Sequence, residues 1–236
     1  MIVVDEATRL RIVTQPDHAR FAADMLSLWR ADGLPDHPRR DDLLFATREH
    51  DNGWREPDAA PRVDPERRRP LTFLTYPEAD RLELWARGIH RFAAERPLAA
   101  LLIAEHAEAV HQPLSDPWKR FFEELEPYRA QWLERVGLDR STVRLDYRFL
   151  GLADTLSLAL CSGEERRLEG LEIDARMIGQ RLELRPFPLA GTTTFEIPVR
   201  WVDKRPYASD TRFAVALARA PWERQAVRIA PFSATE

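Results

Sequence analysis

Residues 48–54 read Arg-Glu-His-Asp-Asn-Gly-Trp, and this stretch places His50 next to Asp51 at the end of an expected helix. Leu43 lies seven residues before His50, so the histidine falls on the apolar, inward face of that helix. Gly53 is a natural terminator for it. The chain is therefore expected to bury a histidine and a carboxylate side by side, which is costly unless they are paired or bind a metal.

Other expected helices carry single ionisable residues on inward faces. His18 lies four residues before Ala22 on the apolar stripe of the first helix, and His106 lies on the buried stripe of a strongly apolar helix. Asp154 sits within residues 149–160, a run that is apolar nearly all round. Imidazole and carboxylate groups together suit iron, manganese, nickel or zinc. Because each residue has its own helix, a helical core could bring them to one metal site.

Each of these residues also has a simpler interpretation. A lone histidine on an apolar face is often a hydrogen-bonded core residue. His50 and Asp51 could stabilise the end of their helix, where the dipole favours a histidine. Asp154 could be held by a buried arginine such as Arg148 or Arg20. The metal hypothesis rests on the residues taken jointly.

Periodicity predicts an α+β fold that is mainly α. Helices are expected over residues 16–31, 41–51, 78–95, 98–110, 116–136 and 141–161, and residues 54–70, with four prolines, are expected as a long irregular loop. Alternation predicts strands over 171–178, 181–187, 193–202, 212–217 and 226–229. We expect a helical metal-binding core over residues 1–163 and a β-rich extension over 164–236. The extension should form a small antiparallel sheet, which an N-terminal hairpin (residues 2–4 and 10–13) could join.

Composition limits the classes of partner. The formal net charge is −4, which gives no reason to expect nucleic acid. No segment approaches the roughly 18 apolar residues that a membrane helix needs, and the N-terminus does not resemble a secretion signal. Cys161 is the single cysteine, which fits a reducing compartment. We expect a cytoplasmic protein that acts on a small molecule; the sequence does not indicate its oligomeric state.

The order His18, His50-Asp51, Asp154 resembles the HD-domain superfamily of metal-dependent phosphohydrolases. In that superfamily a first His, an adjacent His-Asp and a final Asp hold a divalent metal, and further histidines between them can hold a second. His106 matches such a position. The resemblance implies an HD-like helical bundle, one or two metal ions, and His18, His50, Asp51, His106 and Asp154 as ligands.

The chain more closely resembles an uncharacterised bacterial family, domain-of-unknown-function family 3891. The similarity spans most of the chain. The matching pieces are residues 1–3, 15–19, 50–54, 61–65, 99–106 and 154–158.

The resemblance to the HD-domain superfamily implies a hydrolase that acts on a phosphoester, with Asp51 and His106 as catalytic residues. Two alternatives stay open. One is an HD-type diiron oxygenase, in which His90 and His106 would complete a two-iron site. The other is a non-catalytic binding or scaffold module. HD enzymes that bind nucleotides usually carry further Lys or Arg residues on the core helices, and no counterpart is identified in this sequence.

Overall fold

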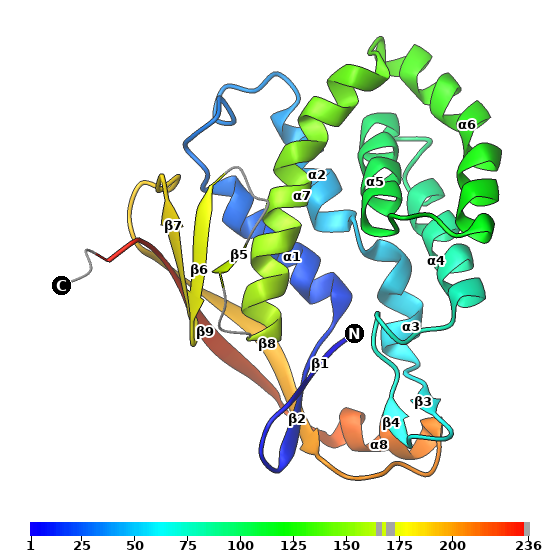
Figure 1. Cartoon of the computed structure of the whole chain (residues 1–236), viewed down its shortest axis with the longest axis vertical. Coiled ribbons are helices and arrows are strands. Elements are labelled where there is room, and N and C mark those ends of the chain that lie inside the picture. Colours follow the sequence, from blue (N-terminus) through cyan, green and yellow to red (C-terminus); the bar gives the residue numbers. More distant parts are fainter. Residues whose placement is uncertain (164–166, 169–172, 234–236) are drawn as a thin grey trace.

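The computed structural model describes residues 1–163, 167–168 and 173–233. Figure 1 shows most of the helices gathered on one side of a curled sheet. The helices are α1 (Gln15–Ser27), α2 (Arg40–Glu49), η1 (Asn52–Trp54), α3 (Arg55–Ala59), α4 (Glu78–His90), α5 (Pro97–Val110), α6 (Asp116–Val136), α7 (Arg140–Ser162) and α8 (Asp210–Arg219). The strands are β1 (Ile2–Asp5), β2 (Arg9–Val13), β3 (Val63–Asp64), β4 (Arg69–Pro70), β5 (Arg167–Leu168), β6 (Asp174–Ile178), β7 (Arg181–Arg185), β8 (Thr193–Asp203) and β9 (Trp222–Pro231).

The main sheet corrects the predicted fold. Among the described residues it has seven strands in the order β1-β2-β8-β9-β7-β6-β5, and β7 pairs in parallel with β9. The prediction of a helical bundle core with a small antiparallel sheet is therefore wrong, because the sheet is large and mixed. The N-terminal hairpin joins it through β2, where Leu10 lies opposite Val202 of β8. Helices α1 and α7 both contact this sheet. Their apolar faces, which were expected to pack against other helices in a bundle, therefore cover the sheet as well.

Two local predictions also differ from the structure. Residues 212–217, predicted as a strand, lie in α8, where Ser209 caps the first turn and the buried Phe213 and Leu217 stand four residues apart. The proline-rich stretch 54–70 contains η1, α3 and the short β3–β4 pair rather than one irregular loop. Of the predicted strand over 171–178, the first two residues lie outside the described part of the chain.

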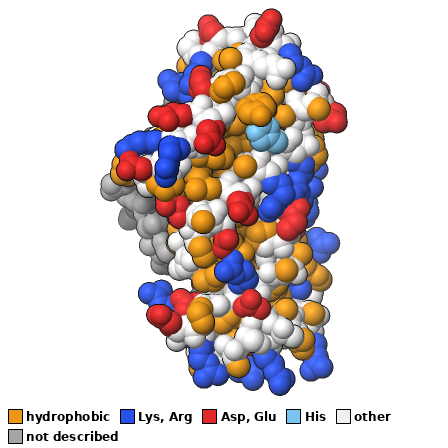
Figure 2. Space-filling model, turned by 90° about the vertical axis from the view of Figure 1, so that its right-hand side faces the viewer, with side chains coloured by type: hydrophobic (Ala, Val, Ile, Leu, Met, Phe, Trp, Pro, Cys, Tyr) orange, Lys and Arg blue, Asp and Glu red, His pale blue; other side chains and the backbone are white. Residues whose placement is uncertain are grey.

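The largest core lies between the sheet and the helices α1, α2, α5 and α7, which pack against one another. No helix among the described residues is long and apolar enough to cross a membrane. On the face shown in Figure 2, basic and acidic side chains intermingle around a band of hydrophobic ones. Charge of one sign therefore does not dominate that face.

Candidate metal centre

His18 lies in the first turns of α1, whose start is fixed by several contacts. The Thr14 hydroxyl oxygen accepts a hydrogen bond from the backbone N–H of Asp17 at 3.1 Å, which caps the helix. The backbone N–H of Gln15 donates to Asp58 at 2.7 Å. Together these contacts hold the buried His18 ring against α7, where it reaches Asp154.

His50 and Asp51 occupy the sharp turn between α2 and η1. The side-chain amide of Asn52 donates to the carbonyl of Glu49 at 2.7 Å and to the carbonyl of Gly88 on α4 at 2.9 Å. This amide therefore caps α2 and pins the turn to α4. Gly53 is required for a different reason from the one expected, because a Cβ there would lie 2.2 Å from the carbonyl oxygen of Leu84.

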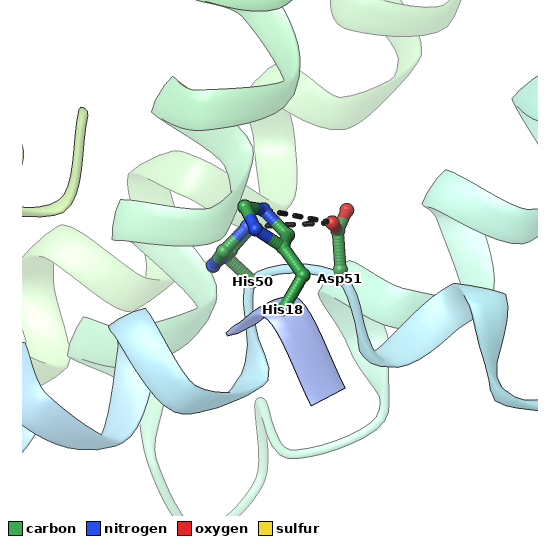
Figure 3. Close-up of side chains that lie close together, drawn as sticks. All are labelled: His18, His50 and Asp51. Atoms are coloured by element: carbon green, nitrogen blue, oxygen red, sulfur yellow. Dashed lines mark ion pairs between the residues drawn. The ribbon is translucent and has the colours of Figure 1, made fainter. Parts of the chain in front are cut away.

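The structure brings together the five residues expected as ligands, from α1, the α2–η1 turn, α5 and α7. Nε2 of His18 lies 2.8 Å from Oδ1 of Asp154 and 3.8 Å from Oδ2 of Asp51. Nε2 of His50 lies 3.2 Å from the same Asp154 oxygen and 3.4 Å from Oδ2 of Asp51. Nε2 of His106 lies 4.0 Å from the other oxygen of Asp154. Figure 3 shows the rings of His18 and His50 beside the Asp51 carboxylate.

The ligand atoms form two overlapping groups that share His50. His18, His50 and Asp51 make one group, and His50, His106 and Asp154 make the other; within each group the ligand atoms lie within 4.8 Å of one another. Three or more nitrogen and oxygen ligands at this spacing could hold a divalent ion. Either group could hold a metal ion.

Hydrogen bonds on the far side of each ring leave Nε2 of His18 and His50 as acceptors. Nδ1 of His50 donates to the carbonyl of Thr47 at 2.7 Å. The Ser157 hydroxyl donates to the carbonyl of Asp154 at 2.9 Å, so its oxygen accepts from Nδ1 of His18 at 3.1 Å. In the neutral rings Nε2 then carries a lone pair. Nε2 of His50 is buried without a hydrogen-bond partner among the described residues. Metal-binding histidines typically have their other ring nitrogen hydrogen-bonded in this way, as Nδ1 is here.

Electrostatics in the cluster favours bound positive charge. Burial would raise the pKa of Asp154, but the adjacent rings of His18 and His50 outweigh it and hold that pKa well below the ordinary value. Burial opposes ionisation of His50, yet the adjacent carboxylates of Asp51 and Asp154 hold the pKa of His50 well above its ordinary value. By contrast, burial lowers the pKa of His106 to about 4, so this ring is neutral at pH 7 and offers a nitrogen lone pair to a metal ion. The two carboxylates thus attract a cation into the space between the rings.

His90 lies apart from the cluster. Its ring packs against Tyr128 at 4.8 Å and Trp132 at 5.3 Å between ring centroids. His90 therefore does not complete a two-iron site with His106. The arginines considered as partners of Asp154 have other contacts: Arg20 donates to Asp17, and Arg148 donates to the carbonyl of Leu145.

A cavity of about 180 Å³ opens onto the cluster. It is lined by His18, Asp51, His106 and Asp154, together with Gln15, Trp54, Phe73, Leu74, Arg81, Trp85, Val110, His111 and Leu158. A second cavity of about 480 Å³ runs along β1 and shares Phe73, Leu74 and Leu158 with the first. The cluster is therefore reachable by a small molecule rather than sealed in the core.

Sequence reasoning missed several residues of the site. Ser157 stands one turn after Asp154 on α7, and that helical spacing could have pointed to it. His111, to which no site role was assigned, also lines the cavity, because α5 ends at Val110 and the chain turns there. Gln15 stands in the matching piece 15–19 but was given no role, and Arg81 carries no motif that would have identified it.

Comparison with known proteins gives a family but no activity. Residues 1–204 match the model of the family described as "Protein of unknown function (DUF3891)". The chain belongs to this family. No curated protein and no solved structure matches it. The function of this family member must therefore be argued from the site itself.

Proposed function

We propose that this member of the DUF3891 family is a divalent-metal-dependent hydrolase that acts on a phosphoester. The observation that carries the proposal is the set of acceptors around His50. Its Nε2 is buried without a hydrogen bond, while carboxylate oxygens of Asp51 and Asp154 lie 3.4 and 3.2 Å away. Imidazole nitrogens and ionised carboxylates held this close attract positive charge, and this mixed nitrogen and oxygen set suits iron, manganese, nickel or zinc.

In this proposal His18, His50, Asp51 and Asp154 hold the metal. Their order along the chain is the one used in the HD-domain superfamily, and we propose kinship at the level of these ligands. A divalent metal bound there would lower the pKa of a water and polarise a phosphoryl oxygen. Asp51, buried and beside both His18 and His50, would hold the metal and orient that water.

His106 has a separate role. Its Nε2 lies toward the second oxygen of Asp154, and its Nδ1 lies 3.3 Å from the hydroxyl of Tyr147. As a neutral ring it can hold a second metal ion, or contact the phosphate or leaving group from the cavity side. Trp54, Phe73 and Trp85 line the same cavity and would limit the access of bulk water to the reacting bond.

A hydrolysis assay tests this function. The metal-stripped chain would be loaded separately with iron(II), manganese, nickel or zinc and given p-nitrophenyl phosphate and bis(p-nitrophenyl) phosphate. We expect p-nitrophenolate release with at least one metal, reduced at least about a hundredfold in His50→Ala. The matched control is His90→Ala, which removes a histidine outside the cluster and should retain activity. Absence of hydrolysis with every metal would contradict the proposal.

A further inference from the structure

Arg81 is the unpaired cation of the cavity wall. It lies in the first turn of α4, is partly buried and lines the same cavity as His106 and Asp154. Its Nε is buried without a hydrogen bond, and its guanidinium has no hydrogen bond or ion pair with any residue that the structure describes. Other arginines with a similarly buried Nε reach a partner through another nitrogen; these are Arg40, Arg129, Arg176, Arg181 and Arg200.

Arg81 and four of the expected metal ligands line the same cavity. Trp85, one turn further along α4, has its ring 5.8 Å from that of His106 and 5.7 Å from that of His111. The indole therefore separates a metal end near His106 from a second end near His111. Burial is the main cause that lowers the pKa of His111 to about 4, and the charge of Arg81, which lines the same cavity, adds to it.

The cavity offers a further polar group that lacks a partner. Gln15 lines it and is 4% exposed, and its Oε1 has no hydrogen-bond partner among the described residues. A buried amide oxygen without a donor is costly, so it is suited to accept from a ligand. A partly buried guanidinium without a counterion is also costly, and its planar fork matches the oxygens of phosphate and carboxylate groups.

We propose that Arg81 binds an anionic oxygen group, phosphate or carboxylate, of a small molecule held in this cavity. The molecule would span from Arg81, past the Trp85 indole, to the cluster of His18, His50, Asp51 and Asp154. The cavity volume of about 180 Å³ is below the roughly 300 Å³ at which pockets for drug-sized ligands begin, so the ligand is small. That this ligand is the substrate rests on the proposed hydrolase function; anion binding by Arg81 does not.

Calorimetric titration with two probes tests the anion site. Phenylphosphonate and benzoate would be titrated into the full chain, both metal-loaded and metal-free. We expect at least one probe to bind, and Arg81→Gln to weaken its binding on the order of tenfold or more with unchanged metal content. Arg81→Lys keeps the charge but loses the planar fork, so its affinity for the probe should lie between those of the wild type and Arg81→Gln. If the binding of phenylphosphonate depends on Arg81, the group that this site binds is a phosphate. If the binding of benzoate depends on Arg81, the group is a carboxylate.

Arg219→Gln is the matched control, because it removes an exposed arginine on α8 with the same change in net charge. It should bind the probes as the wild type does. The anion site is refuted if Arg81→Gln binds both probes as tightly as the wild type, or if the wild type binds neither. If the probes bind through Arg81 but no phosphoester is hydrolysed, the hydrolase proposal fails and the anion site stands. If hydrolysis occurs and Arg81→Gln leaves its KM unchanged, the anion site fails instead.

Discussion

Nε2 of His18 lies 2.8 Å from Oδ1 of Asp154, although the two residues are 136 positions apart in the chain. They meet because α1 and α7 pack against each other over the main sheet. Behind the ring, the Ser157 hydroxyl accepts from Nδ1 of His18 and fixes which nitrogen faces the carboxylate. The orientation of a ligand-type histidine thus depends on a residue from the same helix that supplies the carboxylate.

Replacing Ser157 by alanine should weaken metal binding by about 10–100-fold without unfolding the chain, because the hydrogen bond that orients His18 is lost. Competition with a coloured chelator would measure the affinity. Ser162→Ala is the matched control, since it removes a hydroxyl from the same helix whose bond goes to the carbonyl of Ala159. Equal metal affinity in the wild type and in Ser157→Ala would show that the hydroxyl does not orient a metal ligand.

Replacing Gly53 by alanine should reduce the free energy of unfolding by about 3 kcal/mol or more, since the new Cβ would collide with the backbone of α4 at Leu84. Urea unfolding would measure the loss. Gly191→Ala serves as the control, because a Cβ there meets no atom within 4 Å and the change should stay within about 0.5 kcal/mol. If both variants were equally stable, α4 would not press against the His50-Asp51 turn as the structure has it.

Replacing Phe213 by alanine should destabilise the chain by about 3–5 kcal/mol, because this side chain is fully buried in the small core that α8 shares with Leu10 and Tyr207. Val215→Ala, on the exposed side of α8, should change stability by less than about 0.5 kcal/mol. Thermal or urea unfolding separates the two. Had residues 212–217 formed a strand, Phe213 and Val215 would share a face and the two variants would be affected alike.

Cys161 should resist thiol reagents in the folded protein. Burial raises the pKa of its thiol to about 12, and the nearby Arg11 only partly opposes this. Because the thiolate is the reactive form, a raised pKa means less thiolate at pH 8 than in the unfolded chain, where the pKa is about 8.5. We expect labelling with Ellman's reagent to be at least about a hundredfold slower in the folded than in the urea-unfolded protein. Equal labelling rates would mean that Cys161 is exposed.

The sequence predicted the cluster better than the fold around it. His18, His106 and Asp154 were recognisable because each lies on an apolar helical face, and helix periodicity is a local property. The pairing of β7 with β9, or of β2 with β8, joins segments far apart in the chain, and no local pattern encodes such partners. The extent of the sheet was therefore missed.

Some errors came from ambiguous local patterns. Residues 212–217 alternate in polarity, yet Phe213 and Leu217 also stand at helical spacing, and the cap at Ser209 decides for the helix. Arg81 was missed because a single arginine on an amphipathic helix looks like solvated surface. Its place in the cavity depends on α4 packing beside η1, which the sequence does not reveal.

Metal content tests the central claim most directly. The purified chain and the variants His50→Ala, Asp51→Ala and His90→Ala would be loaded with iron, manganese, nickel or zinc, dialysed, and analysed for metal per chain. We expect one or two ions per chain in the wild type and in His90→Ala, and near-complete loss in His50→Ala and Asp51→Ala, which remove ligands of the cluster. Full occupancy in both of the latter variants, or no retained metal in the wild type, would contradict a metal site at His18, His50, Asp51 and Asp154.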